Sequence, residues 1–403
     1  KKEANQDEYE KAIKMLSQAM EKYYGKKAIL LIDEYDVPIQ NGYLHGYYDS
    51  IVAFIKNLFG NGLKTNNSIE FAVMTGILRV SKESIFSDLN NVSVYTVIDN
   101  TYEEYFGFTE KETKDLLEHF EMELSDEVKK MYDGYKFGSQ EIYNPWSILN
   151  YVERKLPMPY WINTSSDELL KDLFNKSKNE TSEMLEKLIL GEEVEIQYNE
   201  KITFLDLNAV ISNDAPNVIG NFLLFSGYLT TADKSNLAEE GTISVKIPNQ
   251  EIKRVYTEII VKWLSDDGDL YVNKIYKLSD YILEENKEQI EELINKALQN
   301  MSFYDEYENF YHGYMLGLFI NFLNSKRYIV KSNRESGKGR FDIMVEAVDR
   351  SVGIIVEFKV AKENEDIIKV ANEGKEQIKE KQYYKELELN QVKKIITYCI
   401  TNR

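Results

Sequence analysis

The stretch SGKGRFDIMVEAVDRSVGIIVEFKV, residues 336–360, contains two apolar segments, FDIMVEAV and VGIIVEFKV, that are typical of β-strands. Among the charged residues that interrupt them, Asp342 lies in the first segment, and Glu357 and Lys359 lie in the second. A charged side chain on a half-buried strand is costly unless it is paired, hydrated or bound to a metal ion. These strands therefore predict a functional site on a β-sheet.

The spacing of the three charges indicates what such a site could do. Side chains alternate between the two faces of a strand, so Glu357 and Lys359 point the same way and Phe358 points opposite. Antiparallel pairing can bring Asp342 next to Glu357, and two such carboxylates repel unless a divalent cation lies between them. Lys359 could then hold a nucleophilic water or stabilise a pentavalent phosphate, which suits phosphodiester hydrolysis. The alternative is a Glu357–Lys359 ion pair on an edge strand, with Asp342 capping a turn.

The segment 326–340, immediately before Asp342, is basic. The chain as a whole has a formal net charge of −19, which disfavours nucleic acid as a partner for its entire surface. The segment nevertheless holds one acid, Glu335, and six basic residues: Lys326, Arg327, Lys331, Arg334, Lys338 and Arg340. A basic rim beside an acidic site is expected where a polyanion approaches a metal centre, whereas a solvated hairpin is the simpler alternative.

Length and composition exclude several classes of protein. A chain of 403 residues predicts two or three domains. One cysteine, Cys399, permits neither a disulfide framework nor a thiolate metal cage, and the three histidines have no ligand spacing, so Mg²⁺ or Mn²⁺ held by oxygen atoms remains the open choice. No apolar run approaches about 18 residues, and the N-terminus does not resemble a signal peptide. We therefore expect a soluble, cytoplasmic protein that does not engage a membrane.

A second candidate site follows the apolar run Ala28–Ile32. Such a run predicts a strand buried on both faces of a parallel sheet, and IEFAVMTGIL at 69–78, after a helical stretch at 48–60, completes a βαβ unit. Asp33 and Glu34 come directly after the first strand. A carboxylate at the carboxyl end of a buried parallel strand often holds the Mg²⁺ of a nucleotide, and a second acid can orient the attacking water. A residual strand end without function is the competing interpretation.

The C-terminal third follows a regular order. The charged amphipathic stretch 280–300 predicts a helix that could act as a linker, so we place a domain boundary there. An apolar helix at 308–324 comes next, followed by three strands, an amphipathic helix at 362–389 and a last strand at 392–400.

Asp342, Glu357 and Lys359 resemble the active site of the PD-(D/E)XK nuclease superfamily. The predicted order of elements around them is similar to the αβββαβ order of the restriction-endonuclease-like core of that superfamily. The resemblance implies that Asp342 and Glu357 bind the metal ion and that Lys359 acts on the nucleophile. It also implies that Glu308 adds to the metal site. Gln377 and Tyr383 are similar to a glutamine–tyrosine signature that supports the site in some branches. Phe341 replaces the proline of the original motif name, at a position that varies widely.

The N-terminal motifs LIDEYDVPI and TGILRVSKESIFSDLNN, with YDGYKFG, YNPWSILNY and YWINTS, resemble a bacterial family of AAA-ATPase-like proteins with a C-terminal PD-(D/E)XK domain. The resemblance implies a Walker B element with Asp33 for Mg²⁺ and Glu34 as base, Thr75 near the sensor position, and Arg79 close by. No G-x-x-x-x-G-K-[ST] phosphate loop occurs in the sequence. We therefore expect either a piece of a longer protein or a degenerate ATPase, and ATP as a cofactor only if an upstream segment supplies that loop.

Together, these features predict a mixed α/β protein: a partial AAA-type parallel unit at 1–150, a helical lid or connector at 151–285, and a nuclease-like domain at 286–403. The predicted activity is Mg²⁺- or Mn²⁺-dependent hydrolysis of nucleic acid, with DNA favoured over RNA, coupled to the ATPase-like module. Arg334, Lys338 and Arg340 would contact phosphates. The resemblance also allows a homo-oligomer. The alternative is a catalytically inactive nuclease fold that binds nucleic acid or a partner on an ATPase-like scaffold.

Overall fold

The computed structural model describes the following residues: 5–64, 66–78, 92–161, 181–209, 215–236, 241–263, 277–299, 319, 322, 327–336, 339–361 and 365–402. Its chain divides into two compact units, and each has its own hydrophobic core. The first unit comprises 1–181 and 193–252, and the second comprises 182–192 and 253–403. The boundaries predicted at 150 and 285 stay predictions.

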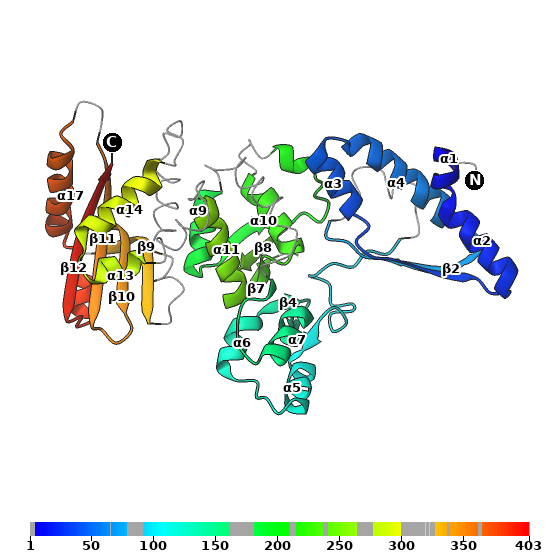
Figure 1. The fold of residues 1–403 in the computed structure, drawn as a ribbon, viewed down its shortest axis with the longest axis horizontal. Helices are drawn as coiled ribbons and strands as arrows, with labels where there is room; N and C mark the ends of the chain where they lie inside the picture. Colours follow the sequence, from blue (N-terminus) through cyan, green and yellow to red (C-terminus); the bar gives the residue numbers. More distant parts are fainter. Residues whose placement is uncertain are drawn as a thin grey trace. The chain divides into compact units, whose positions relative to one another are not determined.

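The first unit begins with helices and a short parallel sheet: α1 (Gln6–Glu10), α2 (Ala12–Tyr24), β1 (Ala28–Ile32), α3 (Val37–His45), α4 (Tyr48–Leu63) and β2 (Ile69–Met74) (Figure 1). α2 ends at Gly25, which has the left-handed φ of 67° that a glycine adopts without strain. β1 pairs in parallel with β2, as the βαβ pattern predicted.

One face of this small sheet departs from the expectation. The continuous apolar run of β1 predicts burial on both faces, but burial alternates along β1, and four apolar side chains on one face stay exposed: Ile29, Leu31, Phe71 and Val73. The register pairs Ile29 with Phe71 and Leu31 with Val73. Among the described residues, helices therefore cover only the other face, and the prediction of two-sided burial was wrong for them.

The rest of the first unit combines helices with two small antiparallel sheets. The elements are β3 (Phe108–Thr109), α5 (Glu110–His119), α6 (Asp126–Tyr132), β4 (Tyr135–Phe137), β5 (Gln140–Tyr143), α7 (Pro145–Arg154), β6 (Val194–Gln197), the 3₁₀ helix η2 (Asp206–Ala209), α10 (Ala215–Phe225), β7 (Thr230–Asn236) and β8 (Thr242–Lys246). α11 (Gln250–Trp263) begins in the first unit and continues into the second. The strand orders are β3-β5-β4 and β6-β8-β7. Tyr132, Tyr143 and Ile148 lie at the centre of the helical core.

The second unit is built around a mixed sheet with the strand order β12-β11-β10-β9 (Figure 1). Its described elements are α9 (Ser182–Leu190), α13 (Leu278–Leu283), α14 (Lys287–Gln299), β9 (Tyr328–Ser336), β10 (Gly339–Ala347), β11 (Val352–Val360), α17 (Ile367–Lys381), α18 (Lys385–Leu389) and β12 (Lys394–Asn402). β9, β10 and β11 are antiparallel neighbours, and β12 runs parallel to β11. The predicted helix at 308–324 lies almost entirely outside the described residues.

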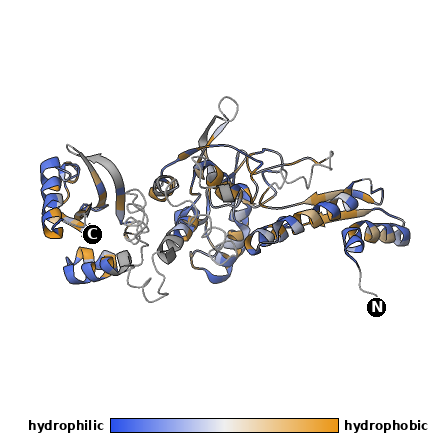
Figure 2. Cartoon of the chain, turned by 90° about the horizontal axis from the view of Figure 1, so that it is seen from above, coloured by the Kyte–Doolittle hydropathy of each residue, from blue (hydrophilic) through white to orange (hydrophobic). Residues whose placement is uncertain are grey.

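The two faces of this sheet carry different cores. Apolar side chains such as Ile343 and Val356 pack with α13 and α14 on one face. On the other face, Met344 and Ile355 pack with Ile378 of α17 and with Tyr383. Hydrophilic and hydrophobic residues are interspersed along the helices, as expected for helices that bury one side (Figure 2). The sheet is thus covered on both faces, and a polar group on either face needs a partner there.

Candidate active site

The pairing of β10 with β11 sets the position of the two predicted carboxylates. Ile343 lies opposite Val356, and Met344 lies opposite Ile355. One further step in this antiparallel register places Asp342 opposite Glu357, on the face covered by α17. Oδ2 of Asp342 accepts a hydrogen bond of 2.6 Å from the backbone N–H of Phe358, which fixes the carboxylate beside the strand that carries Glu357.

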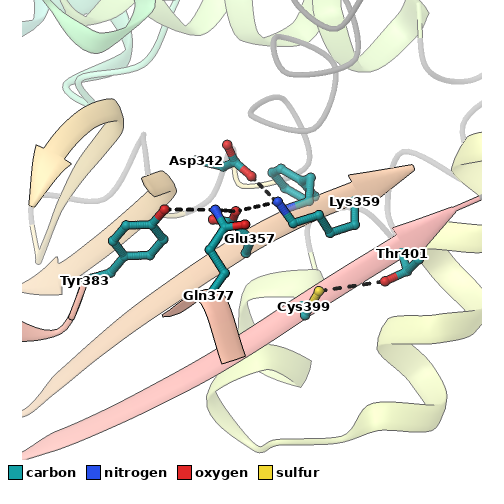
Figure 3. Close-up of polar contacts among 8 residues, drawn as sticks. Asp342, Glu357, Lys359, Gln377, Tyr383, Cys399 and Thr401 are labelled. Carbon is teal, nitrogen blue, oxygen red and sulfur yellow. Dashed lines mark hydrogen bonds and ion pairs between the residues drawn. The ribbon is translucent and has the colours of Figure 1, made fainter. Parts of the chain in front are cut away.

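Glu357 lies at the centre of a polar network (Figure 3). It is only 2% exposed, and its Oε1 lies 3.0 Å from Nζ of Lys359, two residues along the same face. Gln377, from α17, donates from Nε2 to the same Oε1 at 2.5 Å and also contacts the hydroxyl of Tyr383 at 2.9 Å. The predicted residues from β10, β11 and α17 therefore meet at one place.

The Glu357–Lys359 ion pair agrees with part of the simpler interpretation of this sequence. In that interpretation the pair lies on an edge strand, but β11 lies between β10 and β12. Charged side chains on an interior strand lose much of their hydration, so burial of this ion pair has a cost in folding free energy.

Electrostatics keep Lys359 protonated. Burial lowers the pKa of Lys359, but the hydrogen bond to Glu357 and the charges of Glu357 and Asp342 together outweigh that effect, so the pKa lies above its usual value. Burial also raises the pKa of Tyr383, although the hydrogen bond with Gln377 opposes the change. At neutral pH the site therefore contains an ammonium group and a neutral phenol.

Two neighbours of the network were not recognised from the sequence. β12 places Cys399 beside Glu357 and Thr401 beside Lys359, and Sγ of Cys399 lies 3.7 Å from Oγ1 of Thr401 (Figure 3). Gly374 of α17 faces the same position. For Gly374 the sequence offered a signal, because a glycine inside an amphipathic helix usually has a packing or functional reason.

The carboxylates fit a divalent cation held by oxygen atoms. Mg²⁺ is usually bound through one or two carboxylates together with water and substrate phosphates, and Asp342 and Glu357 supply two such groups from adjacent strands. Within the ranges that the structure describes, no group of three or more His, Cys, Asp or Glu side chains is placed to hold a metal ion. Glu308, the predicted third acid, lies outside those ranges.

The predicted phosphate contacts come from the β9–β10 hairpin. The hairpin is present: Arg334 pairs with Phe341, and Arg340 pairs with Glu335. Both arginines are thereby placed on strands that lead to Asp342, although only their backbones are described. Lys338 lies outside the described residues.

At the N-terminal candidate site, the end of β1 contacts the end of β2. Oγ1 of Thr75 donates to Oδ1 of Asp33 and lies 3.4 Å from the backbone N–H of Glu34. Glu34 has a left-handed φ of 51°, and Asp33 and Glu34 are both exposed. The structure thus brings three of the four predicted residues together, and Arg79 lies outside the described residues.

Asp36, also in the LIDEYD motif, was missed as a structural anchor. Its side chain is 2% exposed, and Oδ2 accepts hydrogen bonds of 2.9 Å from the backbone N–H groups of Ile77 and Leu78. Burial raises the pKa of Asp36, although these hydrogen bonds oppose the change. The signal in the sequence was a third acid within four residues of an apolar strand, where a carboxylate needs a partner if it is not hydrated.

Comparison with known proteins places the two ends of the chain in families. Residues 306–403 match the PD-(D/E)XK nuclease superfamily, and residues 1–86 match a family described as predicted AAA-ATPase. The chain therefore combines a PD-(D/E)XK nuclease superfamily domain with an AAA-ATPase-like region. This agrees with the resemblance seen in its motifs.

A relative from Azotobacter chroococcum mcd 1, described as "Uncharacterized protein in vnfD 5'region", is 24% identical over 371 residues. The match covers 89% of this chain and 66% of the relative, so the chain spans just under two thirds of the relative's length. No solved structure matches the chain. Among the helices that the structure describes, none has the length and apolar character required to cross a membrane.

Proposed function

We propose that the C-terminal domain hydrolyses phosphodiester bonds of nucleic acid, with DNA as the favoured substrate and Mg²⁺ or Mn²⁺ as the cofactor. The observation that carries this proposal is the meeting of Asp342, Glu357 and Lys359 on one face of a buried sheet. The stability of the fold does not explain two neighbouring carboxylates and a buried ion pair, because a protein with apolar side chains in their place is often at least as stable. The superfamily match supports the same chemistry.

Each residue has a role in this proposal. Asp342 and Glu357 would hold the cation, with Glu308 as an additional ligand. The cation would neutralise charge on the phosphate and activate the nucleophile. Lys359, whose ammonium group lies 3.0 Å from Oε1 of Glu357, would orient the attacking water and stabilise negative charge on the phosphate oxygens.

Gln377 and Tyr383 would position the catalytic carboxylate. Gln377 donates to Glu357 from α17 and is itself in contact with the hydroxyl of Tyr383. Partners of this kind fix the rotamer of a metal ligand and affect activity without touching the substrate. Arg334, Lys338 and Arg340 would contact phosphates along the approach to Asp342.

The N-terminal region would form a partial AAA-type unit that is coupled to the nuclease. Asp33 would hold the Mg²⁺ of a nucleotide, Glu34 would act as base, and Thr75 would sense the nucleotide next to Asp33, with Arg79 assisting. ATP would be bound only when an upstream segment supplies a phosphate loop. The extents 1–150 for this unit, 151–285 for a helical lid and 286–403 for the nuclease domain belong to the same proposal.

Substitution of Asp342 tests the proposed function. Asp342→Asn keeps the side-chain shape and an oxygen for the Phe358 N–H but removes the charge, so metal-dependent cleavage should fall by at least about 100-fold. Asp349→Asn is the matched control, because Asp349 lies in the exposed turn between β10 and β11 and should leave cleavage unchanged. Metal-dependent cleavage that persists in Asp342→Asn contradicts the assignment. Binding of DNA without any cleavage by the wild type would instead support a catalytically inactive binding module.

A further inference from the structure

Gly374 lies in the middle of α17, on the side that faces the sheet. Val370, Gly374 and Ile378 are the buried residues of this helix, and their spacing of four places them in one row. Glycine is unfavourable inside a helix compared with alanine, because it loses more conformational freedom on folding. Close packing against a neighbouring element would explain why a glycine lies here despite this cost.

The space next to Gly374 is already filled by strand side chains. A Cβ at this position would overlap Sγ of Cys399 on β12 and would lie 3.2 Å from Cγ of Lys359 on β11. It would lie 3.5 Å from Cβ of Cys399, which is an ordinary contact. The sulfur of Cys399 is thus the main obstacle to a side chain here.

The close approach has a direct consequence for the polar network. Gln377 follows Gly374 by three residues, so both lie on the same side of α17. From this side Gln377 reaches Glu357 at 2.5 Å, and Cys399 lies beside Glu357 in the β11–β12 register. Any displacement of α17 away from Cys399 would therefore lengthen the contact between Gln377 and Glu357.

We propose that Gly374 is a positioning residue: its missing side chain lets α17 pack against Cys399 and Lys359, and this packing holds Gln377 on Glu357. The inference rests on the proposed nuclease function for its effect on catalysis. The packing itself can be measured without any activity. Gly374 would act through Gln377 and Glu357 and would not contact the substrate.

The kinetic test compares Gly374→Ala, Cys399→Ala and the double variant in metal-dependent DNA cleavage. Since misplacement of a catalytic group by about 1 Å can cost about 100-fold, Gly374→Ala should lower kcat by at least about tenfold with little change in KM. Cys399→Ala removes the sulfur but leaves the contact of α17 with Lys359, so it should lower kcat less than Gly374→Ala does. Because it removes the obstructing sulfur, it should restore most of the kcat of Gly374→Ala in the double variant.

A glycine elsewhere gives the matched control. Gly60 lies in α4, and a Cβ there would meet nothing within 4 Å. Gly60→Ala should therefore leave kcat unchanged. Full activity of Gly374→Ala would overturn the inference, and so would a loss of activity that Cys399→Ala fails to restore.

Thiol reactivity provides the readout that does not depend on nuclease activity. Cys399 is the only cysteine in the sequence, so its reaction with N-ethylmaleimide reports on this contact alone. Gly374→Ala should speed that reaction severalfold, and Gly60→Ala should not. If the wild type does not cleave nucleic acid, the proposed function fails, and the reaction rates still decide the packing: faster labelling of Gly374→Ala supports it, and equal rates overturn it.

Discussion

Replacement of Lys359 by methionine should destabilise the second unit when no divalent cation is bound. The substitution removes the ammonium group 3.0 Å from Oε1 of Glu357, a side chain that is only 3% exposed, and keeps most of the apolar stem. Removal of one partner of a buried ion pair costs about 3–5 kcal/mol, because the other charge stays buried. Lys359 is 28% exposed and Gln377 still donates to Glu357, so we expect about 2 kcal/mol.

This loss can be measured by scanning calorimetry of the whole chain in EDTA. For a unit of this size, about 2 kcal/mol corresponds to a decrease in Tm of roughly 4–8 °C. Lys369→Met is the matched control, because Lys369 forms an ion pair of 3.8 Å with Glu373 on the exposed side of α17 and should not affect Tm. The double variant Glu357→Gln with Lys359→Met should recover most of the loss, because it leaves no buried charge unpaired.

The pH dependence of the effect follows from the direction of the pKa shift. The pKa of Lys359 is raised above the usual 10.5, so its stabilising contribution is fully present below that value and is lost only as the pH rises further. Below about pH 9 the Lys359 term itself should therefore not change with pH in the difference between wild type and Lys359→Met. An unchanged Tm for Lys359→Met, or the absence of coupling with Glu357→Gln, would refute the buried ion pair.

Two further substitutions test other parts of the chain. Tyr383→Phe removes the hydroxyl that lies 2.9 Å from Nε2 of Gln377, so cleavage should fall by about tenfold while the second unit stays folded, as measured by kcat and circular dichroism. Asp36→Asn should leave the first unit at least as stable as the wild type at pH 7 in calorimetry. The reason is that burial raises the pKa of Asp36 above the usual 3.8, so the wild type loses stability as the pH rises through that raised value, whereas asparagine keeps an acceptor and has no charge.

The outcomes that contradict these two predictions are specific. If Tyr383→Phe has the kcat of the wild type, the hydroxyl of Tyr383 does not help to position Gln377. For Asp36, leucine is the contrasting substitution: it leaves the N–H groups of Ile77 and Leu78 without their acceptor and should cost about 1–3 kcal/mol. A large loss of stability in Asp36→Asn at pH 7, similar to that of the leucine variant, would contradict the account of Asp36.

The sequence predicted the part of the site that depends on strand alternation. The two-residue period of β11 puts Glu357 and Lys359 on one face, and the structure pairs their charges. The antiparallel pairing of β10 and β11 brings Asp342 to the same part of β11, where it accepts from the Phe358 N–H. The roles of these residues stay predictions.

What the sequence could not predict depends on contacts between elements far apart in the chain. β12 pairs with β11 only after the chain has passed through α17 and α18, so the proximity of Cys399 to Glu357 could not be read from spacing. Asp36 was missed because its acceptor role depends on the path of the chain after β2. The apolar run of β1 predicted two covered faces, but it carries no information about which segment covers each face.

The measurement that tests the central claim most directly is cleavage of single-stranded DNA, double-stranded DNA and RNA by wild type and Lys359→Ala, with Mg²⁺, Mn²⁺ or EDTA. The account predicts cleavage by the wild type with either cation, none in EDTA, and a loss of at least about 100-fold in Lys359→Ala. Cleavage that is unaffected by EDTA, or equal in the two proteins, would contradict a hydrolytic centre built from Asp342, Glu357 and Lys359.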